Sequence, residues 1–147
     1  MWVYQLSRPL SADEETALNQ RLQAFVTEWS SHGANLQASC EIRERHFLFL
    51  ATNEHVAAAS GCSIDKSVNF LRQLEQEFNV GFFDRTQLAF REDGQVRAIP
   101  LAQLKKEVAA GTLSPDALYF NTLVGTVGEL QAQWPVPAGE TWLARYF

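Results

Sequence analysis

Two long segments with helical apolar spacing constrain the fold of this chain more than any other feature. The first begins at Ser11 and the second around Ser60-Gly61-Cys62-Ser63. Their apolar stripes are Leu18, Leu22, Phe25, Val26 and Trp29 in the first, and Ile64, Val68, Leu71, Leu74 and Phe78 in the second. Such stripes are typical of amphipathic helices that bury one face against other elements of a globular fold.

The ends of both helices carry sequence signals. Ser11 and Glu14 have the capping-box spacing, in which each side chain accepts a hydrogen bond from the other residue's backbone N–H. We expect the first helix to stop near His32-Gly33, because glycine readily adopts the left-handed cap conformation. Asn79 or Gly81 is expected to end the second helix.

Strand patterns lie before and between the two helices. Residues 2–6 and 38–43 alternate between apolar and polar side chains, which predicts half-buried strands. The apolar run 47–51 predicts a strand that is buried on both faces and therefore central in its sheet.

The second half of the chain has shorter elements. Asp93-Gly94 stands between two strand patterns and predicts a tight hairpin. A third helix is expected over about 101–110, and Thr126 with Glu129 repeats the capping-box spacing ahead of a short helix. The aromatic tail 142–147 is expected to dock on the rest of the protein.

The element order predicts the fold class. Over the first 100 residues the order is strand, helix, strand, strand, helix, strand, strand. This order matches an α+β fold with a ferredoxin-like βαββαβ core, an added hairpin strand and a C-terminal helical extension. We expect a single domain over residues 1–147, with a weak boundary near residue 81 as the alternative.

Charge and composition exclude several classes of function. Twelve Lys and Arg against 17 Asp and Glu give a net charge of -5, which argues against nucleic-acid binding. No apolar stretch approaches the roughly 20 residues of a membrane-spanning helix, and the amino end has no secretion leader. The two cysteines, Cys40 and Cys62, do not form a disulfide framework. We therefore expect a cytoplasmic protein. We also expect that two copies of the chain can form a homodimer through a sheet edge.

Metal and cofactor signals are absent from the sequence pattern. His32, His46 and His55 share no metal-ligand spacing, so we expect no metal and no cofactor. We interpret Trp29, on a core stripe, as structural. Trp134 and Trp142 lie near the prolines at 135 and 137 and are freer to serve a surface.

The segment 57–67 carries the strongest functional signal. Its small residues precede a helix whose first N–H groups can bind an anion, and we select Ser60, Gly61, Ser63, Lys66 and Arg85 as ligand-binding residues. Cys62 is the candidate catalytic residue, because the positive end of a helix favours thiolate. The structural alternative is that Ser60 or Ser63 caps the helix while Cys62 packs as a small hydrophobic side chain.

Two familiar motifs do not fit this segment. Lys66-Ser67 is like the end of a phosphate-binding P-loop, but Asp65 occupies the position of the required glycine and Ser60 that of the first glycine. Residues 63–66 match the SxxK pattern of penicillin-recognising enzymes, but the companion SDN and KTG motifs are missing.

The chain has two resemblances, the first over nearly its whole length and the second over about residues 95–135. The chain resembles a family of small bacterial proteins, found mainly in Bacteroidetes and often labelled ABC transporter ATPase. The resemblance rests on Trp29–Gly33, the SGCSIDKS segment Ser60–Ser67, Asp84-Arg85, Trp134 and Trp142. That resemblance implies no reaction and places weight on the SGCSIDKS motif. Residues 95–135 are similar to GYF-like modules, which bind proline-rich peptides, although the Gly-Tyr-Phe core is not present.

Two functional hypotheses follow. The first is a binding or interaction module with a small anionic ligand or partner segment at the helix start, residues 60–67, near Arg85. The second is a small enzyme that uses Cys62 as nucleophile, with Lys66 or His32 tuning it and backbone N–H groups stabilising an oxyanion. The first is favoured because the sequence names no base with an orienting partner.

Overall fold

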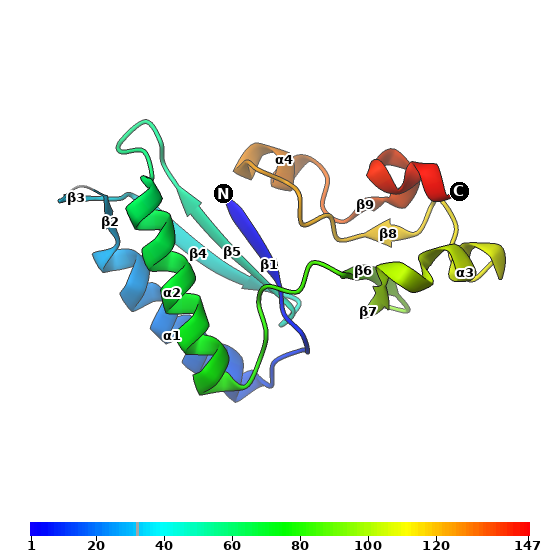
Figure 1. Cartoon of the computed structure of the whole chain (residues 1–147), viewed down its shortest axis with the longest axis horizontal. Helices are drawn as coiled ribbons and strands as arrows, with labels where there is room; N and C mark the ends of the chain where they lie inside the picture. The colour runs from blue at the N-terminus through cyan, green and yellow to red at the C-terminus, as the bar shows by residue number, and fades with distance from the viewer. Residues whose placement is uncertain (32) are drawn as a thin grey trace. The chain divides into compact units, whose positions relative to one another are not determined.

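A computed structural model describes residues 1–31 and 33–147 of the chain, which is mixed α and β as predicted (Figure 1). The chain divides into two units, Met1–Phe83 and Asp84–Phe147. This division falls just after Gly81, the alternative boundary that the sequence offered. A single domain over the whole chain stays a prediction.

The first unit contains an antiparallel sheet of β1 (Trp2–Gln5), β4 (Ala38–Arg43) and β5 (Phe47–Thr52). The strand order is β1-β5-β4, so the prediction that β5 is central is confirmed. In β5, the side chains of Phe47 through Leu50 are all buried. A strand paired on both edges has its backbone N–H and C=O groups satisfied inside the sheet, which suits such an apolar segment.

Helices α1 (Ala12–Glu28) and α2 (Gly61–Phe78) cover one face of this sheet. Leu48 and Leu50 point to the same face because side chains alternate along a strand. They belong to one buried cluster with residues of both helices, of β1 and of the segments after β1 and α2: Tyr4, Leu6, Leu10, Leu18, Leu22, Val26, Leu71, Leu74, Val80 and Phe82. Figure 1 shows the two helices side by side along the sheet.

The first helix ends earlier than the sequence predicts. The predicted end near His32-Gly33 is wrong, because α1 stops at Glu28 and Trp29 is its C-cap. The chain then forms a short hairpin of β2 (Ser30–Ser31) and β3 (Ala34–Asn35). Gly33, with a φ of 80°, serves the turn of that hairpin rather than a helix cap. His32 lies outside the described residues.

The ferredoxin-like arrangement is not confirmed. Strands β1, β5 and β4 have the order that the first three strands of that plan require. The next strand, β6 (Gln87–Glu92), pairs with β7 (Gln95–Pro100) and β8 (Leu118–Tyr119) in a separate sheet. After α2, the chain instead bonds to the segment after β1, because Ser7 N–H donates to Gly81 O at 2.9 Å.

The second unit contains a four-stranded antiparallel sheet with the order β7-β6-β8-β9, where β9 is Val136–Pro137. The predicted β6–β7 hairpin is confirmed, and Asp93 and Gly94 at its turn have φ angles of 50° and 75°. Positive φ at both central residues gives the turn a twist that matches the paired strands.

Short helices complete the second unit. They are a 3-10 turn at Leu101–Gln103, α3 (Leu104–Ala109), α4 (Val127–Ala132), and 3-10 helices at Ala138–Glu140 and Trp142–Tyr146. The capping box of Thr126 and Glu129 is present as predicted. The tail docks as predicted, because Leu143 is fully buried in the core of this unit together with Leu88, Phe90, Ile99, Leu104, Leu113, Tyr119 and Ala138.

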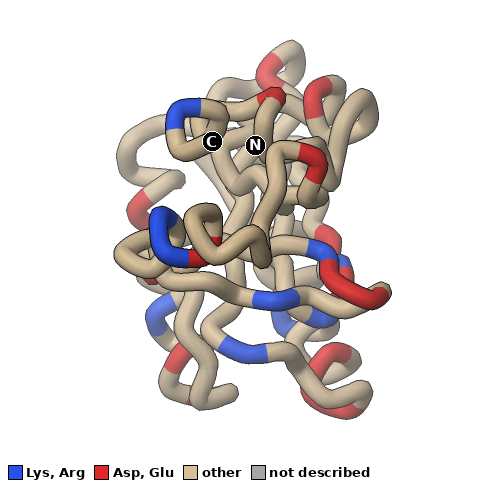
Figure 2. The backbone as a smooth tube through the Cα atoms, turned by 90° about the vertical axis from the view of Figure 1, so that its right-hand side faces the viewer, with Lys and Arg blue, Asp and Glu red and all other residues tan. Residues whose placement is uncertain are grey.

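Charged residues of both signs are interspersed along the backbone (Figure 2). Several of them form ion pairs: Arg21 with Glu77, Arg43 with Glu41, Arg45 with Glu15, Arg72 with Glu75, and Arg97 with Glu92 and Glu107. Exposed pairs of this kind each add little to stability.

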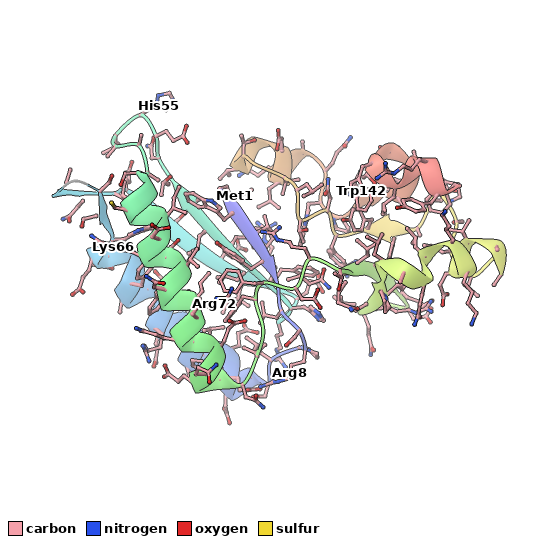
Figure 3. The ribbon with its side chains drawn as sticks, viewed as in Figure 1. Met1, Arg8, His55, Lys66, Arg72 and Trp142 are labelled. Atoms are coloured by element: carbon pink, nitrogen blue, oxygen red, sulfur yellow. The ribbon has the colours of Figure 1, made fainter. Side chains whose placement is uncertain are left out.

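Arg8 connects the beginning of α1 to the end of α2 (Figure 3). Its guanidinium donates to both carboxylate oxygens of Glu14, at 3.0 and 2.7 Å, and to the carbonyl oxygens of Phe78 and Asn79. The hydrogen bonds from Arg8, together with that from the Ser11 backbone, lower the pKa of Glu14 from 4.5 to about 2. A carboxyl group whose pKa is lower in the folded state stabilises the fold only while it is ionised.

We predict that Glu14→Gln lowers stability and flattens its dependence on pH. The stabilisation from Glu14 is complete above the unfolded pKa of 4.5 and is lost as the pH falls towards about 2. Glutamine keeps the capping box, so the variant removes mainly the charge. Urea unfolding midpoints measured between pH 7 and pH 2 test this. The control Asp13→Asn removes a charge from the same helical turn and should keep the wild-type pH profile; equal profiles for wild type and Glu14→Gln would contradict the prediction.

Candidate functional site

The first turn of α2 is capped so that two of its backbone donors stay open. Ser60 is the N-cap, and its Oγ accepts a hydrogen bond from Ser63 N–H at 3.2 Å. Within the described part of the chain, no acceptor faces the N–H groups of Gly61 and Cys62. No acidic residue lies in this first turn. The turn therefore presents two donors and the positive end of the helix dipole to solvent.

Trp29 holds this turn in place from the end of α1. Its indole Nε1–H donates to Ser63 O at 2.8 Å in a buried hydrogen bond, and the side chain is only 2% exposed. The ring also packs against Phe25 and Trp2, with ring centroids 5.3 and 5.8 Å away. The structural role predicted for Trp29 is confirmed, and the sequence did not show that this role fixes the start of α2.

Cys62 is exposed, so the alternative in which it packs as a hydrophobic side chain is wrong. The buried face of α2 instead includes Ser63 and Ser67, which are 0% and 2% exposed. Their hydroxyls donate to the carbonyl oxygens of Ser60 and Ile64, at 2.8 and 2.6 Å. A hydroxyl that bonds to its own helix can be buried without an unsatisfied donor.

The predicted ligand residues of α2 therefore separate into two groups. Ser60 and Ser63 form the cap, and the Ser63 side chain is buried. Gly61 and Lys66 are exposed, and Lys66 follows Cys62 by four residues, which puts both on one side of the helix. No hydrogen bond or ion pair engages Lys66 within residues 1–31 and 33–147. The open groups are thus the N–H donors of Gly61 and Cys62, the thiol of Cys62 and the ammonium group of Lys66.

Arg85 belongs to the second unit and is exposed in the segment before β6. Its predicted place beside the start of α2 stays a prediction. The adjacent Asp84 accepts hydrogen bonds from the Thr86 backbone and hydroxyl, at 2.8 and 2.6 Å, and these bonds lower the pKa of Asp84. Asp84 therefore stabilises the turn that leads into β6.

Two of the three histidines, His46 and His55, lie in the described part of the chain, and neither forms a hydrogen bond with Cys62 there. His46 is 6% exposed, and burial lowers its pKa, which favours the neutral ring. His55 is exposed at the loop before α2 (Figure 3), where its backbone N–H donates to Asn53 Oδ1. His32, the second residue proposed to tune Cys62, lies outside the described residues.

A cavity of about 400 Å³ in the second unit was missed by the sequence reasoning. Trp142, which the sequence singled out as free to serve a surface, lines it together with residues around α4 and β9. Trp134 instead donates its indole N–H to Asn121 O at 3.2 Å. Among the described residues, no group of three His, Cys, Asp or Glu side chains is placed to hold a metal ion, and no helix is long and apolar enough to cross a membrane.

Comparison with known proteins gives no relative. No family model, no curated protein and no solved structure matches the chain. The two resemblances stated from sequence motifs therefore stay predictions.

We predict that Trp29→Phe lowers the free energy of unfolding by about 1–2 kcal/mol, because it removes the buried hydrogen bond from the indole N–H to the Ser63 carbonyl. Amide hydrogen exchange of Ser63 and Ile64, whose N–H groups are hydrogen-bonded to Ser60, should also become faster. Urea unfolding and exchange measured by NMR check both effects. The control Trp2→Phe removes an indole N–H that has no acceptor among the described residues, and it should change exchange in this turn less. Equal effects of the two variants would contradict a specific role of the Trp29 hydrogen bond.

Proposed function

We propose that the protein is a binding or interaction module whose ligand site is the exposed first turn of α2. The ligand is a small anion or an anionic segment of a partner. The observation that carries this proposal is the cap geometry. Ser60 satisfies Ser63 N–H, while the N–H groups of Gly61 and Cys62 have no acceptor among residues 1–31 and 33–147. Donors of this kind at a helix start are suited to phosphate or carboxylate oxygens.

Local charge supports the same ligand class. The first turn of α2 has no carboxylate that would compete with an anion, and Lys66 supplies a cation one turn further along. The net charge of -5 provides no long-range attraction for anions, so recognition depends on this turn and its immediate neighbours. The buried bond from Trp29 keeps the donors in one geometry before the ligand arrives, which limits the ordering cost of binding.

We predict that inorganic phosphate shifts the backbone amide resonances of Gly61 and Cys62 in a titration followed by ¹H–¹⁵N NMR. Lys66→Ala should weaken binding by about two- to fivefold, the range expected for one exposed ion pair. The matched control, Lys105→Ala, removes an exposed lysine from the second unit and should leave the affinity unchanged. The proposal fails if phosphate leaves both amides unmoved, or if Lys66→Ala and Lys105→Ala have equal effects.

A cysteine-dependent enzyme is the second candidate, and the exposure of the Cys62 thiol favours it. In that function the thiolate is the nucleophile, and the open N–H groups of the turn stabilise an oxyanion. Cys40 is a useful internal reference, because it is half-buried and burial raises the pKa of its thiol.

Alkylation by iodoacetamide separates the two candidates. If the protein is a binding module, iodoacetamide should react with Cys62 no faster in the folded protein than in the urea-unfolded chain. The variant Cys62→Ser should still bind phosphate. If the protein is a cysteine-dependent enzyme, iodoacetamide should react with Cys62 faster in the folded protein than in the unfolded chain at neutral pH. Mass spectrometry resolves the rates of Cys62 and Cys40 site by site. An accelerated Cys62 rate would contradict the simple module.

We also propose a cytoplasmic protein that forms a homodimer through the sheet of the first unit. The sheet order makes β1 and β4 its edge strands. An edge strand offers backbone N–H and C=O groups that can pair with a second copy of the chain. A ferredoxin-like core and the two family resemblances remain proposals beside this one. Light scattering over a range of protein concentrations tests the dimer, and a monomer mass throughout would exclude it.

A further inference from the structure

The cavity of the second unit lies among α4, β9 and the two C-terminal 3-10 helices. Its volume of about 400 Å³ falls within the range of small-molecule sites, roughly 300–1,000 Å³. All of its lining residues belong to this one unit. The walls combine apolar side chains with a few polar groups, which is the usual composition of a ligand site.

Carboxylates supply the formal charge of the cavity lining. Glu129 and Glu140 line it, and no Lys or Arg does. Glu129 uses Oε2 to accept hydrogen bonds from the N–H groups of Gly125 and Thr126. Within the described residues, Glu140 is exposed and has neither a hydrogen bond nor an ion pair for its carboxylate. This part of the sequence also carries only negative formal charges, because residues 107–144 contain four acidic residues and no lysine, arginine or histidine.

The apolar wall is suited to the body of an organic ligand. Leu123 lines the cavity and is 64% exposed, so its side chain is accessible to a ligand. Trp142 is partly exposed while its Nε1 is buried, so the accessible part of its ring is carbon. The Arg145 guanidinium lies 5.5 Å from the Trp142 ring centroid, so this ring already has a cation beside it.

We infer that this cavity binds a small organic ammonium ion, with the amine beside Glu140 and Glu129 and the apolar body against Leu123 and Trp142. The two carboxylates of the lining favour a cation over an anion. The apolar wall favours an alkyl- or arylamine over a bare metal or ammonium ion. This site has the opposite charge preference to the first turn of α2, so the two proposals are independent.

The test is a titration of the full chain with phenethylammonium, followed by ¹H–¹⁵N NMR at millimolar concentrations of the amine. We expect the Trp142 indole resonance and the amides of Gln133 and Thr141 to shift, while Gly61 and Cys62 do not. Glu140→Gln should weaken binding by about two- to fivefold. The control Asp116→Asn removes an exposed carboxylate outside the lining and should leave the affinity unchanged. Leu123→Ser, at an exposed position, should also weaken binding.

Four outcomes would overturn the inference. They are the absence of shifts at the cavity, equal binding of the anionic analogue 3-phenylpropionate, an unchanged affinity in Glu140→Gln, and binding of an acetylated lysine-containing tripeptide without binding of phenethylammonium. The last would make the site a peptide surface. Phosphate shifts at Gly61 and Cys62 are measured on the same samples, so a failure here is distinct from a failure of the anion site.

Discussion

Burial of four successive side chains in β5, Phe47–Leu50, is the constraint on which the first unit depends. A strand with no polar face needs partners on both edges, and β1 and β4 supply them. Leu48 and Leu50 then define the face that α1 and α2 cover. The chain that leaves β5 after Thr52 must return over this same face, which puts the start of α2 at Ser60 and within reach of the Trp29 indole. The geometry of the candidate anion site is thus a consequence of sheet packing.

The elements that could be predicted from the sequence are those whose cause lies within a few residues. Both capping boxes pair a hydroxyl with a carboxylate three residues later. The Asp93-Gly94 turn needs two residues that tolerate positive φ, and this dipeptide supplies them. The central place of β5 follows from its own apolar run. In each case the sequence window that carries the signal is also the window in which the stabilising contact forms.

The features that could not be predicted depend on contacts between residues distant in sequence, or on polar side chains that are buried in the core. The end of α1 at Glu28 reflects the pairing of β2 with β3, two-residue strands too short to leave a periodic pattern. The separate sheet of β6 reflects a choice of strand partner that periodicity does not encode. Ser63 and Ser67 are polar residues, so a search for an apolar stripe leaves them out of the predicted buried face. They are buried because their hydroxyls form hydrogen bonds within α2. The cavity arises where α4 and the C-terminal 3-10 helices meet, and its residues are scattered from Asn121 to Trp142.

Both proposed sites arise beside helix caps that leave part of their bonding capacity unused. Ser60 satisfies one N–H of α2 and leaves the Gly61 and Cys62 donors for an anion. Glu129 caps α4 with Oε2, and Glu140, which lines the same cavity, has no internal partner in the described part of the chain, so negative charge remains at the proposed cation site. A cap is a stable place for such a group because the helix already fixes its position. Binding at either proposed site is therefore expected to order little beyond the ligand itself, and the sign of the charge at each site, rather than the net charge of -5, is expected to set its ligand preference.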